Sequence, residues 1–316
     1  SSYLFSYIGY DPTCKVTGNT GATDGTQKPL IENLDLLHTN GTTNMVRMFQ
    51  GFGYSTMKSL DLGSTFNTSS VINMNAMFFY AGYKAMANFD LGDKFDTSNV
   101  NDMGGMFIYC GHNALTSLDL GENFDTSNVT YMGSMFGALG ANALTSLNLR
   151  DKFDTSNVID MSWMFSDCGR DTLTVLNLGD KFDTRNVLNM NGMFNRTAYN
   201  MTNLDLGDKF YTTKVENMAL MFRNTGLYKM TVLDLGPVFT KIPSGKISGT
   251  IEDEDVGSSY DAYYKMFDNT GKSGTVIYAP ESIFSNEKKF KLNTSSSTTI
   301  NCGNGTINPI YKPELT

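Results

Sequence analysis

Histidine, cysteine and charged residues are scarce in this chain, and each scarcity argues against a class of function. The 316 residues hold two histidines and four cysteines, with no C-x-x-C pair and no Cys/His cluster, which argues against a structural zinc site. Only 18% of the residues are charged and the formal net charge is −8, whereas a nucleic-acid binder presents a basic surface. No run of about 18 apolar residues occurs, so we expect no membrane span within the chain. Nucleotide-binding and nucleophile motifs do not stand out, and we expect no enzyme activity.

Methionine, by contrast, is abundant, with 19 copies, and its positions reveal a repeat. The dipeptide Met-Phe recurs at intervals of 28 or 29 residues, ending at Phe49, Phe78, Phe107, Phe136, Phe165, Phe194 and Phe222. An eighth copy ends at Phe267, after an insertion. All 19 methionines fall on positions of the repeat, so we expect them to fill its core rather than to bind a metal or a ligand.

One clean unit shows what each part of the repeat should form. Leu115, Leu118 and Leu120 match the L-x-x-L-x-L pattern of a leucine-rich repeat, which predicts a short strand with one buried face. The later Val-x-x-Met-x-x-Met-Phe stretch has apolar residues about three apart, which predicts a turn of 3₁₀- or α-helix. A unit of this size cannot bury its own apolar face, but stacked copies can cover one another.

These features predict an α/β repeat solenoid. We expect a leucine-rich-repeat-like, right-handed coil with one parallel β-sheet and short 3₁₀ or α turns, made of about eight coils of 29 residues. Residues 1–33 should form an N-terminal cap, 34–271 the solenoid with an insertion at 240–262, and 272–316 a C-terminal cap and the start of a linker. Asp, Thr and Asn of the Phe-Asp-Thr-Ser-Asn-Val motif should serve as scaffolding that satisfies backbone groups at bends.

The motifs resemble those of the BspA-like leucine-rich-repeat surface proteins of bacteria. Residues 95–100 and 124–129 both read F-D-T-S-N-V, and M-x-x-M-F follows each, as in one subgroup of that family. The resemblance covers roughly residues 34–270. It implies a secreted or cell-surface protein, usually regarded as an adhesin or of unknown function.

The four cysteines are expected to be free thiols. Cys110 and Cys168 occupy equivalent places two repeats apart, which puts them roughly 10 Å from each other in a stack with about 4.8 Å per strand. A disulfide needs Cα atoms within about 7 Å. Cys14 and Cys302 fall in opposite caps, so we expect them to lie further apart still.

Polar residues along the predicted sheet are the first candidate site. The middle residue of each Leu-x-Leu should point to solvent, giving a mostly acidic row: Asp61, Asp90, Asp119, Asn148, Asn177, Asp205 and Asp234. Such a face suits a basic protein segment, divalent cations or a hydroxyl-rich glycan. The alternative is a solvated face whose acids keep the surface soluble.

Two further candidates lie outside the strands. The loops after Met-Phe carry Phe79, Tyr80, Tyr83 and Tyr109, and exposed aromatic residues favour interfaces. The insertion carries the acidic run Glu252, Asp253, Glu254 and Asp255, a weak candidate for Ca²⁺, although the spacing of an EF-hand loop is absent. A mobile solvated loop is the alternative there, and we expect no other cofactor.

The sequence therefore favours an extracellular binding or adhesion module of a bacterial surface protein, with a host or neighbouring-cell protein or glycan as its partner and a monomer as its state. The first alternative is a structural stalk or shaft that presents another module. A more remote one is a glycan-active β-solenoid enzyme, which would need irregular clusters of acids with Arg or Lys. Here the acids are periodic.

Overall fold

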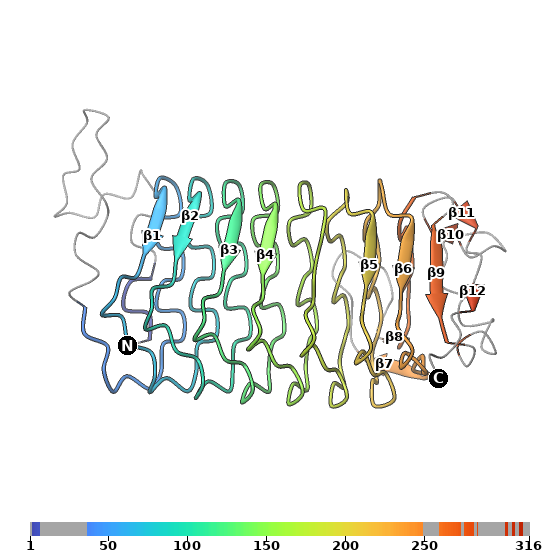
Figure 1. Ribbon diagram of the computed structural model, residues 1–316, viewed down its shortest axis with the longest axis horizontal. Coiled ribbons are helices and arrows are strands. Elements are labelled where there is room, and N and C mark those ends of the chain that lie inside the picture. Colours follow the sequence, from blue (N-terminus) through green and yellow to red (C-terminus); the bar gives the residue numbers. More distant parts are fainter. Residues whose placement is uncertain are drawn as a thin grey trace.

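Figure 1 shows the repeats of the computed structural model as a row of coils, each lying beside the next. The structure describes residues 2–6, 37–248, 259–272, 275–280, 283, 301–302, 305–306 and 310–311. The expected acidic Ca²⁺ candidate at 252–255 and Cys14 lie outside the described residues.

Short parallel strands line one side of the row. They are β1 (Ser59–Asp61), β2 (Asn88–Asp90), β3 (Ser117–Asp119), β4 (Ser146–Asn148), β5 (Asn203–Asp205), β6 (Val232–Asp234) and β9 (Val276–Ala279). Each of the first five has a buried middle residue between two exposed ones. Equivalent residues pair across coils, for example Leu118 with Leu147, so the sequence period sets the register.

The expectation of one continuous sheet is wrong. The strands form separate parallel sheets, β1–β2, β3–β4 and β5–β6–β9–β12, where β12 is Ile310–Tyr311. The repeat at 175–177 forms no strand. Strands of three residues hold few ladder bonds, so a small shift between coils interrupts the ladder. Two antiparallel pairs complete the set: β7 (Lys246–Ser248) with β8 (Ser259–Asp261), and β10 (Asn301–Cys302) with β11 (Gly305–Thr306).

The expected helical turns are also wrong, because the Met-x-x-Met-Phe segments form turns that bond to the next coil. The N–H groups of Met45, Arg47 and Phe49 donate to carbonyl oxygens one coil ahead at 2.8–3.0 Å. Between them, Met48 and Gln50 close turns within their own coil. In a helix, the N–H groups would donate to carbonyl oxygens of the same coil. Here alternate groups bond outward, and residues of left-handed conformation recur every coil to allow it, including Arg47, Ala76, Ser134 and Trp163.

Methionine and phenylalanine fill the core, as predicted. Every methionine is buried except Met57, which is partly buried and still packs against the core. The Met-Phe rings form one stacked column, with centroids 5.4–5.8 Å apart from Phe49 to Phe267. Offset stacking of this kind adds to the burial of each ring. Cys110 and Cys168 are buried free thiols, and burial raises the pKa of both.

Both ends of the row continue its bonding pattern. At the start, Phe5 stacks on Phe49 with centroids 5.2 Å apart, and its N–H donates to the Met48 carbonyl. At the other end, β9 pairs with β6 in parallel register. The described part of the insertion forms the β7–β8 hairpin, and Tyr260 of that hairpin joins an apolar cluster with Leu220.

Candidate ligand-binding surfaces

The predicted sheet-face residues stand at the last position of their strands, except Asn177, whose repeat forms no strand; all are exposed except the half-buried Asp234. Each also has a local structural role, because one side-chain oxygen accepts the N–H of the residue two positions later at 2.8–3.1 Å. The pairs are Asp61–Gly63, Asp90–Gly92, Asp119–Gly121, Asn148–Arg150, Asn177–Gly179, Asp205–Gly207 and Asp234–Gly236. These bonds cap the turn that leaves the strand.

The turn itself explains the glycines of the L-x-L-G motif. Gly92 has φ +77°, and a Cβ built on it would lie 2.2 Å from the carbonyl oxygen of Gly63 in the previous coil. Arg150 takes the equivalent left-handed place with φ 62°. Its guanidinium contacts Asp119 and Glu122, and the hydrogen bond from Arg150 lowers the pKa of Asp119. The acidic row is therefore divided into two halves by Asn148, Asn177 and Arg150.

No group of three or more potential metal ligands occurs within the described ranges. The acids of the sheet face stand one per coil, where each caps a turn, rather than close together around one point. A periodic row with one carboxylate per coil offers a ligand repeated polar contacts across coils, not a single coordinating centre.

The loop aromatics do come together. Tyr80 and Tyr109 stack with centroids 4.6 Å apart, Phe79 contacts Tyr80 at 4.5 Å, and Tyr83 lies 5.5 Å from Tyr80. All four predicted residues are half-buried. We name this side of the coils, formed by the loops after Met-Phe, the loop edge.

Two members of the loop edge were missed from the sequence. Tyr54 stacks on Tyr83 at 4.8 Å, and Tyr83 in turn stacks on His112 at 4.6 Å. Residues 54, 83 and 112 are spaced by 29, so alignment of the loops by repeat position would have found them. The backbone fixes this register, because the N–H of Tyr80 donates to the Ile108 carbonyl at 2.8 Å and that of Tyr109 to Gly137 at 2.8 Å.

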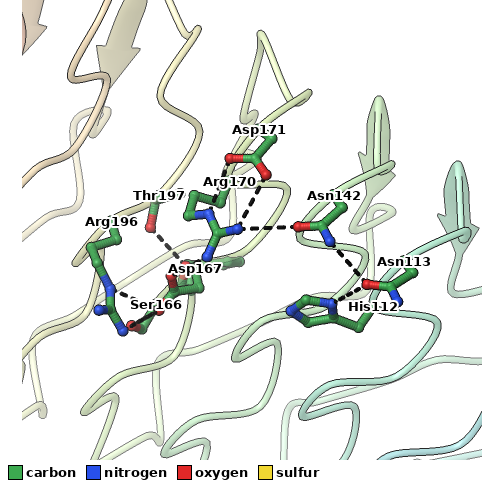
Figure 2. Close-up of polar contacts among 10 residues, drawn as sticks. His112, Asn113, Asn142, Ser166, Asp167, Arg170, Asp171, Arg196 and Thr197 are labelled. Atoms are coloured by element: carbon green, nitrogen blue, oxygen red, sulfur yellow. Dashed lines mark hydrogen bonds and ion pairs between the residues drawn. The ribbon is translucent and has the colours of Figure 1, made fainter. Parts of the chain in front are cut away.

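Polar side chains continue the loop edge in the following coils. Figure 2 shows Asn113, Asn142 and Arg170 linked in line, with Asn142 donating to Asn113 at 2.9 Å and Arg170 donating to Asn142 at 3.1 Å. His112 lies 2.7 Å from Asn113 through its Nδ1 atom. Burial lowers the pKa of His112, and its hydrogen bond with Asn113 opposes that effect. An amide oxygen can only accept, so His112 donates through Nδ1 to the Asn113 oxygen, which also accepts from Asn142.

Asp167 anchors the far end of this network. Its carboxylate is 12% exposed and receives Arg196 at 2.9 Å and Arg170 at 3.5 Å. Arg170 also pairs with Asp171 at 3.0 Å. The loop edge thus changes from aromatic in the first coils to charged and amide-rich in the later ones, across a continuous series of side-chain contacts.

The stacked coils, turn ladders and paired equivalent residues define a strand-rich repeat protein. The chain belongs to the family described as Mycoplasma protein of unknown function, DUF285, whose model matches residues 23–136 and again residues 140–234. No curated protein and no solved structure matches the chain significantly. Within the part of the chain that the structure describes, none of the elements is a helix of the length and hydropathy that a membrane span requires.

Proposed function

We propose that this protein is an extracellular binding module of a bacterial surface protein, and that the loop edge is where it contacts a protein or glycan. We further propose that its coils are a right-handed solenoid of the BspA-like leucine-rich-repeat type. The observation that carries the binding role is the stacked group of Tyr54, Tyr80, Tyr83, Tyr109 and His112 on one edge of neighbouring coils.

The fold does not require these aromatic rings. In the next coil, Ala138 stands at the position of Tyr80 and Tyr109, with the same left-handed conformation. Ala141 stands at the position of Tyr83 and His112. Since this coil keeps the same backbone bonds with small side chains, the rings add a surface rather than a core. Aromatic residues are enriched at binding interfaces because they bury large area at low entropic cost.

The shape of the edge favours an extended ligand. Successive coils are about 4.8 Å apart, so the aromatic rings and the amide and guanidinium groups beyond them follow one line of contacts. Sugar rings or an extended peptide would meet tyrosine edges first and the groups of Asn142 and Arg170 further along. The sheet face contributes polar contacts, although its oxygens already cap turns.

A glycan array, together with capture of host-cell surface proteins, tests the binding role. The double variant Tyr83→Ala, Tyr109→Ala should lose the ligand that the unaltered chain retains. Tyr228→Ala is the control, because Tyr228 is a 60% exposed tyrosine in the loop of a later coil, one residue past the repeat position of Tyr83, and its ring contacts Tyr199 rather than the stacked group. Equal retention by both variants would contradict a role for the aromatic group.

A structural stalk is the second candidate, favoured by the uniform bonding along the row. The buried threonines Thr68, Thr97, Thr126, Thr155 and Thr184 each donate to a carbonyl of the next coil at 2.7–2.9 Å. Such a shaft would be stiff without any ligand. If the intact chain retains nothing from the array or from cell-surface proteins, while a longer protein containing it does, the stalk is the correct assignment.

A further inference from the structure

A second surface lies at the bends that follow the Phe-x-Thr motif, which we name the bend edge. Three successive bends, at Phe153, Phe182 and Phe210, form a shallow pocket of about 340 Å³ lined by Asp154, Ser156, Lys181, Asp183, Arg185 and Lys209. A neighbouring pocket of about 300 Å³ includes Lys241, Glu216 and Lys246, and Lys246 pairs with Asp261 at 3.1 Å. The proposed binding role of the loop edge uses none of these residues.

The sequence departs from its repeat at this place. Earlier coils read F-D-T-S-N-V, where the Asn side chain donates to the previous coil, as Asn128 does to the Ser98 carbonyl at 2.7 Å. The coil at 182–187 reads F-D-T-R-N-V, which introduces Arg185. The coil at 210–215 reads F-Y-T-T-K-V, which removes the acid and introduces Lys214. Both departures make the edge more positive without a gain for the core.

The acids of the pocket do not cancel this positive charge. Asp183 is 4% exposed and is held by Arg185, whose Nε donates to it at 2.8 Å. Of the remaining charged groups that line the pocket, Asp154 carries one negative charge, whereas the exposed Lys181 and Lys209 carry two positive charges. Lys209 donates to the Asp180 carbonyl at 3.0 Å, which holds its ammonium over the same edge without neutralising it.

The next coils extend the cationic edge. Lys214 donates to the Asn186 side chain at 2.7 Å, and Lys241 donates to the Thr213 carbonyl at 2.9 Å. Both lysines are exposed. Their ammonium groups rest on neutral oxygens, so their charge remains available to a ligand. The guanidinium of Arg185 lies over the Tyr211 ring at 5.6 Å, which adds an aromatic surface beside the charges.

We propose that the bend edge of the later coils binds an acidic glycan through its sulfate or carboxylate groups. Ammonium and guanidinium groups bind such anions by charge-assisted hydrogen bonds. The half-buried Asp154 and the exposed Asp180 and Asp208 are interspersed with the cations, and they would repel a nucleic acid with one phosphate charge per about 1.7 Å. A glycan with widely spaced charges meets the lysines and avoids the acids.

Binding of heparin, hyaluronan and a 20-base-pair DNA duplex to the full chain tests the proposal. The triple variant Lys181→Gln, Lys209→Gln, Lys214→Gln keeps the Arg185–Asp183 pair and so preserves the buried contact. The control Lys58→Gln, Lys94→Gln, Lys229→Gln removes the same charge from exposed lysines elsewhere, and Lys94 stands at the repeat position of Lys181. Circular dichroism and urea unfolding confirm that both variants fold.

We expect the triple variant to bind an acidic glycan at least about tenfold more weakly, a loss that corresponds to about 1.4 kcal/mol, and the control to bind as the unaltered chain does. Weakened binding of heparin alone identifies sulfate as the preferred group, and weakened binding of hyaluronan as well identifies carboxylate. Equal losses in both variants, no binding of either glycan, or DNA binding as tight as glycan binding would overturn the proposal. The double variant Tyr83→Ala, Tyr109→Ala should bind the glycan normally, which separates this site from the loop edge.

Discussion

The buried threonine of the repeat gives the sharpest test of how the coils are held together. Thr155 is fully buried, and its hydroxyl makes two bonds to one residue of the next coil. It donates to the Asp183 carbonyl at 2.9 Å and accepts the Asp183 N–H at 2.7 Å. Thr126, at the same position one coil earlier, donates to the Asp154 carbonyl at 2.8 Å, while the Asp154 N–H bonds to Lys152 instead.

Valine replaces threonine at nearly constant volume, so Thr→Val removes the hydroxyl with little change in packing. Thr155→Val leaves both a carbonyl and an N–H of Asp183 without that partner, and each buried unsatisfied group costs about 1–3 kcal/mol. We expect Thr155→Val to lower the free energy of unfolding by about 2–4 kcal/mol. Thr126→Val, which orphans one carbonyl, should lower it by about 1–2 kcal/mol.

Urea unfolding, followed by circular dichroism, measures the difference. Thr174→Val is the control, because Thr174 is exposed, and it should change stability by less than about 0.5 kcal/mol. The unfolding free energies are compared with one shared m-value, the slope of free energy against urea concentration. A variant that changes this slope is left out, since long repeat arrays can unfold in more than one step. Equal losses for Thr155→Val and Thr126→Val would refute the two-bond reasoning, and losses no larger than that of Thr174→Val would refute the scaffolding role of the motif.

Three further outcomes follow from the core and the loop edge. Phe136→Ala should cost about 3–5 kcal/mol in urea unfolding, because its fully buried ring stacks between two others, and a loss below 1 kcal/mol would show that the column is not a core. Cys110 and Cys168 should resist a thiol reagent at pH 8 until denaturant is added, because burial raises the pKa of each thiol; rapid labelling of the native chain would contradict this. Burial lowers the pKa of His112, so the folded chain binds this proton less tightly than the unfolded one. Above the pKa of this histidine in the unfolded chain, about 6.5, the ring does not lower the stability of the fold. As the pH falls below that pKa, the unfolded chain takes up the proton more readily, and the free energy of unfolding decreases. The unfolding midpoint should therefore fall more between pH 7.5 and 5 for the unaltered chain than for His112→Gln, and parallel falls would contradict the assignment.

The sequence alone was sufficient for the repeat, the core and the polar scaffold. A 29-residue period predicts that Met-Phe and Leu-x-Leu residues lie in the core, because equivalent residues of stacked coils contact one another. The threonine and aspartate roles followed from the need to pair buried backbone groups at bends. Thr97 and Asp96 bear this out, since Thr97 donates to the Asp125 carbonyl and Asp96 accepts the Ser98 N–H.

The turn conformation was not predictable from the same pattern. Apolar spacing near three fits a helical turn and also a chain that alternates between turns and bonds to the next coil. Only the left-handed residues distinguish the two, and glycine marks some of them, as at Gly105 and Gly192. Trp163 and Leu220 take the same conformation in other coils without any local signal. Tertiary bonding between coils overrides their preference.

The candidate sites show a similar division. The loop aromatics were predicted because they stand in the loops that follow Met-Phe, and the structure brings them together: Phe79, Tyr80, Tyr83 and Tyr109. The sheet-face acids stand at strand ends, but their turn-capping bonds depend on backbone geometry that composition does not reveal. The cations of the bend edge were visible only as departures from the F-D-T-S-N-V motif, once the structure had shown what the motif does.

Hydrogen–deuterium exchange with a captured ligand tests the binding role of the loop edge most directly. We expect ligand-dependent protection in peptides that cover residues 79–85 and 108–114, the loops that carry the stacked aromatic rings. The strands β1 to β4 should exchange as they do without ligand. Protection confined to the strands, or none in either loop while the ligand is bound, would contradict the account.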